Sequence, residues 1–233
     1  MMFTLKARLA LVTLACLSSF CCYSIAASKT PDATSSKTKA TVTTVAGDLV
    51  AGKTKSEDNR CQECHGPDGN GLGPAAGAAG KFAKLAGQYP DYMQKQIQDF
   101  RSGLRKHDLM LLMAKSIDDT DAADISAHFA NQKKMQGNGS GSNPTGKNLF
   151  ISGDPARNIL PCTSCHGVDG KGLDAAGQTI PIIGGQDWHY LERQLQDWRR
   201  GERHNSTGGV MNQIARQLTD TEIQALTDYI AGL

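Results

Sequence analysis

The sequence predicts an all-α protein that contains two related domains in tandem. One set of sequence signals occurs twice in the same order along the chain, which indicates a duplicated domain. Apolar residues recur at helical spacing in both copies, and no stretch shows the alternating pattern of a half-buried strand. The 233 residues are enough for two compact domains of about 90 residues each.

The first 27 residues have the features of a secretory signal peptide. Lys6 and Arg8 precede an apolar stretch, and small residues follow it near Ala26. The apolar stretch is short and contains Ser and Thr, whereas a membrane-spanning helix needs about 20 apolar residues. We therefore expect cleavage of residues 1–27 and export to the periplasm. The alternatives are that this segment is retained as a membrane anchor, or that a lipid is attached at Cys16, Cys21 or Cys22.

Removal of the leader changes the counts of cysteine and charge. Three of the seven cysteines belong to the leader, so the exported chain keeps Cys61, Cys64, Cys162 and Cys165. Two of the 25 Lys and Arg residues also lie in the leader, so 23 remain against 23 Asp and Glu. A nucleic-acid-binding domain would carry a concentrated basic face, so the balanced charge argues against a nucleic-acid partner.

Two polar segments divide the chain. Residues 28–45 are rich in Ser, Thr and Lys and have no apolar periodicity, so we expect a flexible tether. Residues 136–145 are rich in Gly, Ser and Asn and are typical of a linker. These segments place the first domain at residues 46–135 and the second at residues 146–233.

The repeat can be followed residue by residue. Cys61 and Cys162 are 101 positions apart, and Met110 and Met211 have the same separation. Between them, "AGQYPDYMQKQIQDFRSGLR" in the first copy matches "GGQDWHYLERQLQDWRRGER" in the second at an offset of 98. Matching signals in matching order indicate that one domain was duplicated.

Each copy is predicted to be mostly helical. The expected buried stripe contains Tyr92, Ile97 and Phe100 in the first copy and Trp188, Leu191, Leu195 and Trp198 in the second. The segment "LTDTEIQALTDYI" begins with Thr219 and Glu222, which have the spacing of a capping box at the start of a final helix.

The four remaining cysteines all lie in two C-x-x-C-H motifs, "CQECH" at Cys61 and "CTSCH" at Cys162. This motif attaches c-type haem, because its two thiols add to the porphyrin vinyl groups and the adjoining histidine binds the iron. It predicts two covalently bound haem c groups, one on Cys61 and Cys64 and one on Cys162 and Cys165. His65 and His166 are the expected axial ligands.

Three other kinds of site use paired cysteines. A C-x-x-C redox pair needs no histidine, and a zinc site with four thiolates would have to join motifs far apart in the chain. Disulfides between the domains are the third possibility. The two histidines, the export signal and the duplication together favour haem.

The residue at the sixth iron position decides which chemistry a haem supports. Histidine with methionine is the ligand pair of electron-transfer cytochromes c, whereas an open iron position permits peroxide or gas chemistry. Met110 and Met211 hold the same register in the two copies, so we expect them to be the second axial ligands. Met113 is close enough to compete with Met110 in the first domain, while Met93 and Met135 are expected to fill the core.

Several stretches together resemble the cytochrome c4 family of two-haem class I cytochromes c. In the first copy these are "CHGPDGNG" and "FAKLAGQYPDYMQKQIQDF". In the second they are "GKNLFISG", "CTSCHGVDGKG", "IPIIGGQDWHYLERQLQDWRRGER" and "LTDTEIQALTDYIAGL". The resemblance covers nearly the whole chain after the leader, apart from the tether.

This resemblance implies both a fold and a function. The fold is two tandem class I cytochrome c domains related by pseudo-twofold symmetry, with the haems near their interface. The function is electron transfer without catalytic residues, in the periplasm or in association with the membrane. The implied partners are redox proteins: a membrane quinol-oxidising complex or other donor, and a terminal oxidase as acceptor.

The chain departs from the family pattern at one position. Such domains usually carry a proline before the Leu-Ala-Gly-Gln stretch, and its carbonyl can accept the N–H of the axial histidine. Pro181 fits this place in the second copy, whereas Ala83 occupies it in the first. An alanine carbonyl can accept the same bond from a less rigid loop. The surroundings of the two haems are therefore expected to differ.

Two other functions are consistent with the motifs. The first is a two-haem peroxidase-like oxidoreductase with an open iron position, against which the matched Met110 and Met211 argue. The second is a cytochrome subunit bound to a sulfur-compound dehydrogenase. The tether and the self-contained duplication favour an independent carrier over a subunit.

Overall fold

The computed structural model describes residues 45–72, 82–139, 141–175 and 178–233. The predicted signal peptide, and all of the predicted tether except Val45, lie outside the described residues. The described residues all belong to one compact unit. No helix within this part of the chain is long and apolar enough to cross a bilayer.

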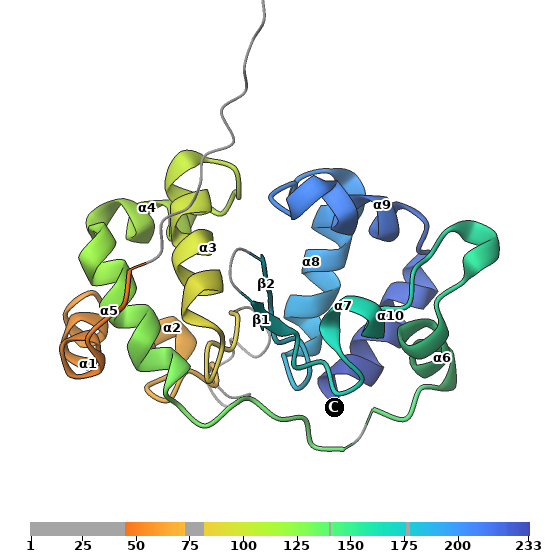
Figure 1. Cartoon of the computed structure of the whole chain (residues 1–233), viewed down its shortest axis with the longest axis horizontal. Coiled ribbons are helices and arrows are strands. Elements are labelled where there is room, and N and C mark those ends of the chain that lie inside the picture. The colour runs from red at the N-terminus through yellow and green to blue at the C-terminus, as the bar shows by residue number, and fades with distance from the viewer. Residues whose placement is uncertain (1–44, 73–81, 140, 176–177) are drawn as a thin grey trace, which may run out of the picture. The chain divides into compact units, whose positions relative to one another are not determined.

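The described helices form two groups with the same order (Figure 1). The first half contains α1 (Leu49–Asp58), α2 (Gln62–His65), α3 (Pro90–Ser102), α4 (Asp108–Ser116) and α5 (Asp119–Ala130). The second half contains α6 (Pro144–Ser152), α7 (Thr163–His166), α8 (Trp188–Arg200), α9 (Val210–Arg216) and α10 (Asp220–Ala231), with short 3-10 turns at Pro155–Arg157 and Thr207–Gly209. The prediction of a mostly helical protein with two tandem domains is confirmed.

The second half also contains a short hairpin that the sequence did not predict. Strands β1 (Leu173–Ala175) and β2 (Gln178–Ile180) pair antiparallel, with Leu173 opposite Ile180. Three residues per strand are too few to show a period of two, so the pairing leaves no pattern to read. The hairpin leads directly into Pro181.

The ends of the long helices follow local rules. Thr219 and Glu222 form the predicted capping box at the start of α10, since the Thr219 side chain accepts from the Glu222 N–H and the Glu222 side chain accepts from the Thr219 N–H. Helices α3 and α8 both end at a glycine in the left-handed conformation, with φ of 81° at Gly103 and 77° at Gly201. This conformation favours glycine and stops both helices at equivalent places.

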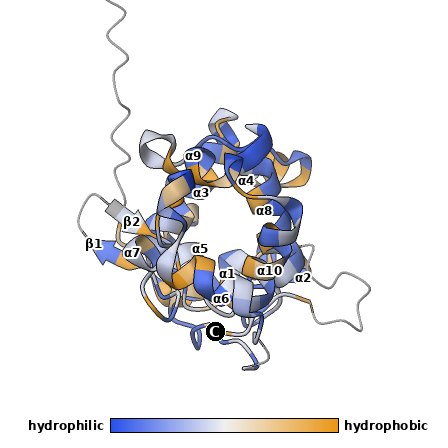
Figure 2. Cartoon of the chain, turned by 90° about the vertical axis from the view of Figure 1, so that its right-hand side faces the viewer, coloured by the Kyte–Doolittle hydropathy of each residue, from blue (hydrophilic) through white to orange (hydrophobic). Residues whose placement is uncertain are grey.

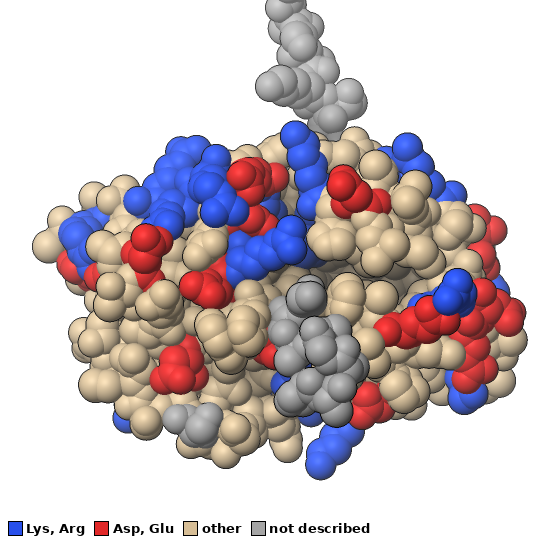
Figure 3. Space-filling model, turned by 180° about the vertical axis from the view of Figure 1, so that it is seen from behind, with Lys and Arg blue, Asp and Glu red and all other residues tan. Residues whose placement is uncertain are grey.

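The helices combine polar and apolar faces, as Figure 2 shows by their mixed blue and orange colouring. On the face drawn in Figure 3, basic and acidic side chains are intermixed. Both observations fit a folded unit whose apolar stripes face inward and whose charges are balanced.

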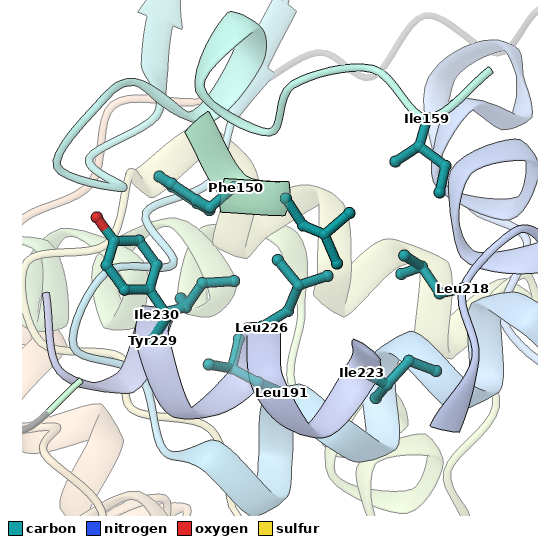
Figure 4. Packing of buried hydrophobic residues seen from close by; sticks show 9 residues of the cluster. Phe150, Ile159, Leu191, Leu218, Ile223, Leu226, Tyr229 and Ile230 are labelled. Carbon is teal, nitrogen blue, oxygen red and sulfur yellow. The ribbon is translucent and has the colours of Figure 1, made fainter. Parts of the chain in front are cut away.

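The core of the second half is a cluster of buried residues from α6, α8, α10 and the loops between them (Figure 4). Its members are Leu149, Phe150, Ile159, Leu191, Leu218, Ile223, Leu226, Tyr229 and Ile230. The first half has a smaller cluster of three buried residues, Met93, Ile125 and Phe129. Met93 and Met135 are both buried, which confirms the prediction that they fill core space.

One predicted core residue is exposed. Trp188 has 44 % of its surface accessible, so the prediction that it belongs to the buried stripe of α8 is wrong. It is the first residue of that helix, where a side chain can extend past the packed face, and its ring stacks on His189 with the centroids 3.7 Å apart. Leu191 and Trp198 of the same stripe are buried as predicted.

Candidate haem sites

The two C-x-x-C-H motifs fold into the same single helical turn. In α2 the His65 N–H donates to the Cys61 carbonyl at 3.0 Å, and in α7 the His166 N–H donates to the Cys162 carbonyl at 2.8 Å. Residues three and four positions apart share one face of a helical turn. Both thiols and the imidazole of each motif are therefore presented on one side.

The four cysteines favour haem over the other thiol chemistries. They are free thiols that form no disulfide among the described residues. Burial raises the pKa of Cys61 and of Cys162 to about 11, whereas a redox-active C-x-x-C pair depends on a depressed thiol pKa. Within the described ranges, no three His, Cys, Asp or Glu side chains come together in a group that could hold a metal ion. The redox-pair and zinc interpretations find no support here.

Each motif histidine is held by a main-chain carbonyl from the loop that follows. His65 Nδ1 lies 2.8 Å from the Ala83 oxygen, and His166 Nδ1 lies 3.1 Å from the Pro181 oxygen. These are the acceptors that the family resemblance implied, and the alanine takes the role of the proline. A carbonyl can only accept, so each Nδ1 carries the proton and each Nε2 keeps its lone pair for a metal.

Burial lowers the pKa of both histidines, so their imidazoles are neutral at neutral pH. A neutral imidazole with a free Nε2 is the form that ligates iron. The donor chemistry therefore fits a haem iron in both halves.

The two predicted methionine ligands lie near the start of corresponding helices. Met110 is in the first turn of α4 and Met211 in the first turn of α9, and both are half-buried. The Met110 N–H donates to His107 Nδ1, and the Met211 N–H donates to Ser206 Oγ, each over 3.3 Å. Met113, one turn further along α4, is also half-buried. The shared register with Met211 continues to favour Met110.

A buried polar cluster that the sequence analysis missed lies where the two halves meet. Arg105 and Arg203 hold equivalent positions after α3 and α8, and their residues are 9 % and 7 % exposed. The oxygen of Gln96 accepts from Arg105 at 2.9 Å and from Arg203 at 3.1 Å. The oxygen of Gln194 accepts from the same two guanidinium groups at 2.9 and 2.7 Å. The repeated arginine at the end of both matching stretches was the available signal.

The side chains that accept from these guanidinium groups are neutral. Arg105 also donates to the Tyr190 hydroxyl at 2.8 Å, and Arg203 to the Tyr92 hydroxyl at 3.1 Å. Among the described residues, no Asp or Glu forms an ion pair with either arginine. Burial, and then the nearby Arg105, lower the pKa of Arg203. Asp99 lies near enough to favour the charged form of Arg105 without forming an ion pair with it. Two neighbouring buried cations still carry more positive charge than one carboxylate offsets, so the cluster fits an acidic group such as the propionates of a haem.

Comparison with known proteins decides the family. The cytochrome c family model matches residues 49–148 and again residues 144–233. Cytochrome c4 of Pseudomonas aeruginosa is 38 % identical over 193 residues, which cover 81 % of this chain and 90 % of that protein. The chain belongs to the cytochrome c4 family.

Two further relatives extend the comparison. The crystal structure of reduced cytochrome c4 from Pseudomonas stutzeri superposes with a TM-score of 0.72 at 37 % identity, covering 81 % of this chain and all of that one. A protein named thiosulfate dehydrogenase electron acceptor, from Stutzerimonas stutzeri, is 36 % identical over 177 residues, which cover 74 % of this chain and 78 % of that protein.

Membership in the cytochrome c4 family establishes the broad activity. The protein is an electron carrier rather than an enzyme, and its two cytochrome c domains each carry one covalently bound haem c.

Proposed function

We propose that the protein is a periplasmic carrier with two haems ligated by histidine and methionine, which passes electrons from the respiratory chain to a terminal oxidase. In the first half Cys61 and Cys64 attach the haem, and His65 and Met110 are its axial ligands. In the second half Cys162 and Cys165 attach the haem, and His166 and Met211 are its axial ligands. The main support is the matched pair of histidine-to-carbonyl bonds directly after the two motifs.

The side chains contribute fixed geometry to this function. When bound, the haem supplies an iron that cycles between the ferric and ferrous states. The carbonyls of Ala83 and Pro181 fix the tautomer and the ring direction of the two histidines, so the imidazoles need not move during electron transfer. Met110 and Met211 would each supply a neutral sulfur to the iron, which would favour the ferrous state and raise the reduction potential.

The arginine cluster is proposed to receive acidic groups of the two haems. Arg105 and Arg203 are buried, and both are held by Gln96 and Gln194. Haem propionates would supply further negative charge beside these two cations. Positive charge close to a haem disfavours the ferric state, so both arginines are expected to raise the potentials.

Partner docking is expected to depend on local patches. The exported chain has balanced charge, and basic and acidic side chains are intermixed on the face drawn in Figure 3. Strong long-range steering needs a large field of one sign, so association should depend only weakly on ionic strength.

The ligand assignment is tested by far-red absorption of the oxidised holoprotein during a redox titration. Methionine bound to ferric haem gives a charge-transfer band in this region, and we expect two such contributions with two high potentials. Replacing Met110 or Met211 should remove one contribution each, while the control M113L should retain both. A high-spin ferric haem, or rapid peroxide turnover, in the unmodified protein would refute the assignment.

A second role is suggested by one relative. The Stutzerimonas stutzeri protein is named as the electron acceptor of a thiosulfate dehydrogenase. By analogy, this chain could take electrons from a sulfur-compound dehydrogenase instead of a quinol-oxidising complex. Stopped-flow reduction of the oxidised holoprotein by each class of donor separates the two roles, because the physiological donor should reduce it much faster.

A further inference from the structure

Two buried glutamines connect the halves of the molecule reciprocally. Gln88 and Gln186 occupy equivalent positions just before α3 and α8, and they are 4 % and 3 % exposed. Both side chains reach across to a main-chain segment of the other half. Neither residue belongs to the motifs or to the arginine cluster.

Each glutamine pairs with both main-chain groups of one residue. The Gln186 oxygen accepts from the Lys84 N–H at 2.8 Å, and its amide nitrogen donates to the Lys84 carbonyl at 3.0 Å. The Gln88 oxygen accepts from the Ile182 N–H at 3.0 Å, and its amide nitrogen donates to the Ile182 carbonyl at 2.9 Å. Such two-point pairing fixes the position and the orientation of the segment, as a neighbouring strand would.

These contacts act on the supports of the axial histidines. The Lys84 N–H and the Ala83 carbonyl belong to one planar peptide group, and the Ala83 carbonyl accepts from His65. The Ile182 N–H and the Pro181 carbonyl form the corresponding group for His166. A glutamine oxygen and a histidine N–H therefore bond to opposite ends of the same peptide group.

A peptide group transmits the effect of one hydrogen bond to the other. A bond accepted from its N–H polarises its carbonyl, and a polarised carbonyl accepts more strongly. A stronger acceptor at Nδ1 makes the imidazole a better electron donor to a metal at Nε2. The Gln186 oxygen should thereby strengthen His65 as a ligand, and the Gln88 oxygen should strengthen His166.

We propose that each glutamine is a positioning residue for the axial histidine of the opposite half, with Gln186 acting on His65 and Gln88 on His166. This inference rests on the proposed function, in which these histidines bind the haem irons. Loss of a glutamine weakens electron donation to one iron and raises the potential of that haem. The haem that responds belongs to the half that does not contain the substituted residue.

The two crossed contacts should differ in size. Pro181 has a fixed φ and continues from β2, so its carbonyl is partly held without Gln88. Ala83 has no such restriction, so the orientation of its carbonyl depends more on the glutamine of the opposite half. Loss of Gln186 should therefore change its haem more than loss of Gln88 changes the other.

The test uses the holoprotein and the variants Q186L and Q88L, which remove both bonds with little change of volume. The potential of each haem is measured by titration, with signals assigned through the Met110 and Met211 variants. A second readout is the exchange rate of the two histidine Nδ1–H protons in the reduced protein, followed by NMR with labelled histidine. Q132L is the matched control, because the Gln132 side chain donates to His128 within its own half.

The proposal expects a crossed pattern. Q186L should raise the potential of the first haem and speed exchange at His65, and it should leave His166 unchanged. Q88L should do the reverse with a smaller shift, and Q132L should change neither haem. Effects confined to the half that carries the substitution, equal effects on both haems, or no effect would overturn it.

Two safeguards keep the result interpretable. If Q186L fails to take up haem, Q186N is measured in the same way, since its shorter amide cannot hold both bonds but keeps its polarity. If the unmodified protein lacks methionine charge-transfer bands, the methionine assignment fails while the histidine exchange rates still test the glutamines. The two failures are therefore distinguishable.

Discussion

The two halves of the protein share one order of helices and differ in the apolar core that supports it. Among the described residues, the second half buries a cluster of nine core residues, and the first half a cluster of three. The first half buries further apolar side chains outside its cluster, such as Phe100 and Met135, but they do not form one packed core. A small domain with a divided core gains more from a further stabilising group. We therefore expect the two copies of the duplicated fold to depend on their haems to different degrees.

The support of the motif histidine differs in the same direction. The second half uses Pro181 after a paired hairpin, whereas the first half uses Ala83 in a loop without that restriction. Gln186 and Lys84 hold the first loop through contacts with the other half. Gln88 holds the second loop in the same way, so the difference lies in Pro181 and the hairpin, which also support that loop from within its own half.

The largest expected difference follows from removing one haem at a time. Replacing Cys61 and Cys64 with alanine should unfold most of the first half, a loss on the order of a whole domain's stability of about 5–15 kcal/mol. Replacing Cys162 and Cys165 should leave more structure in the second half, because its nine-residue cluster remains. Hydrogen exchange measured by peptide mass spectrometry checks this. It compares the protection of α3 and α5 with the protection of α8 and α10. Equal loss of protection would show that core size does not matter.

Core truncation gives the next largest effect. Phe129 and Phe150 are 1 % and 0 % exposed, and replacing either with alanine should cost about 3–5 kcal/mol. The same loss is a larger share of the first half's stability, so F129A should begin to unfold at lower denaturant than F150A. Chemical denaturation of the holoprotein, with probes in each half, measures both midpoints. A lower midpoint for F150A would reverse the ranking of the halves.

Acid should weaken an ion pair in the second half, between Arg157 and Glu222. The ion pair with Arg157 lowers the pKa of Glu222 to about 2, from an ordinary value of 4.5. A depressed pKa adds stability that is complete above about pH 4.5 and is lost as the pH falls towards 2. E222Q should remove this pH dependence and destabilise the protein less than F150A does.

Thermal unfolding of the second half between pH 6 and 2.5 measures the acid effect. The matched control is E57Q, because Glu57 forms an exposed pair with Lys53 on α1. Exposed pairs contribute little, so the melting temperature of E57Q should depend on pH as steeply as that of the unmodified protein. If the melting temperature of E222Q kept the same pH dependence, the pair with Arg157 would not be the source of the acid effect.

The smallest expected effects come from exchanging the two histidine supports. A83P should stabilise the first half, and P181A should destabilise the second, each by about 0.4–1 kcal/mol, because proline restricts the unfolded chain. A83P should also bring the two haem potentials closer together. Denaturation and paired redox titrations measure these changes. A strongly destabilised A83P would show that this position does not accept proline's φ.

Much of this structure could be predicted from local signals. The duplicated helices and the capping box of Thr219 and Glu222 follow from periodicity and short spacings. The carbonyl acceptors at Ala83 and Pro181 were implied by the family resemblance. Periodicity also identified Leu191 and Trp198 as core. It failed for Trp188, because a stripe does not tell where packing ends at a helix terminus.

The features that could not be predicted join residues about a hundred positions apart. Gln96 and Gln194 each bind both arginines, and Gln88 and Gln186 each bind the other half. A lone glutamine in a helix or loop carries no period, spacing or charge that marks it. Only the repeat at a fixed offset indicated that these positions were equivalent, and it gave no partner for them.

The most direct test of the account is a potentiometric titration of the intact holoprotein followed in the far-red region. If both halves hold a haem between histidine and methionine, two one-electron steps appear, and each step removes its own methionine-to-ferric band. Substitution of Met110 or Met211 then abolishes one step's band and leaves the other. A single step, or a ferric haem that is high-spin at neutral pH, would contradict two closed sites.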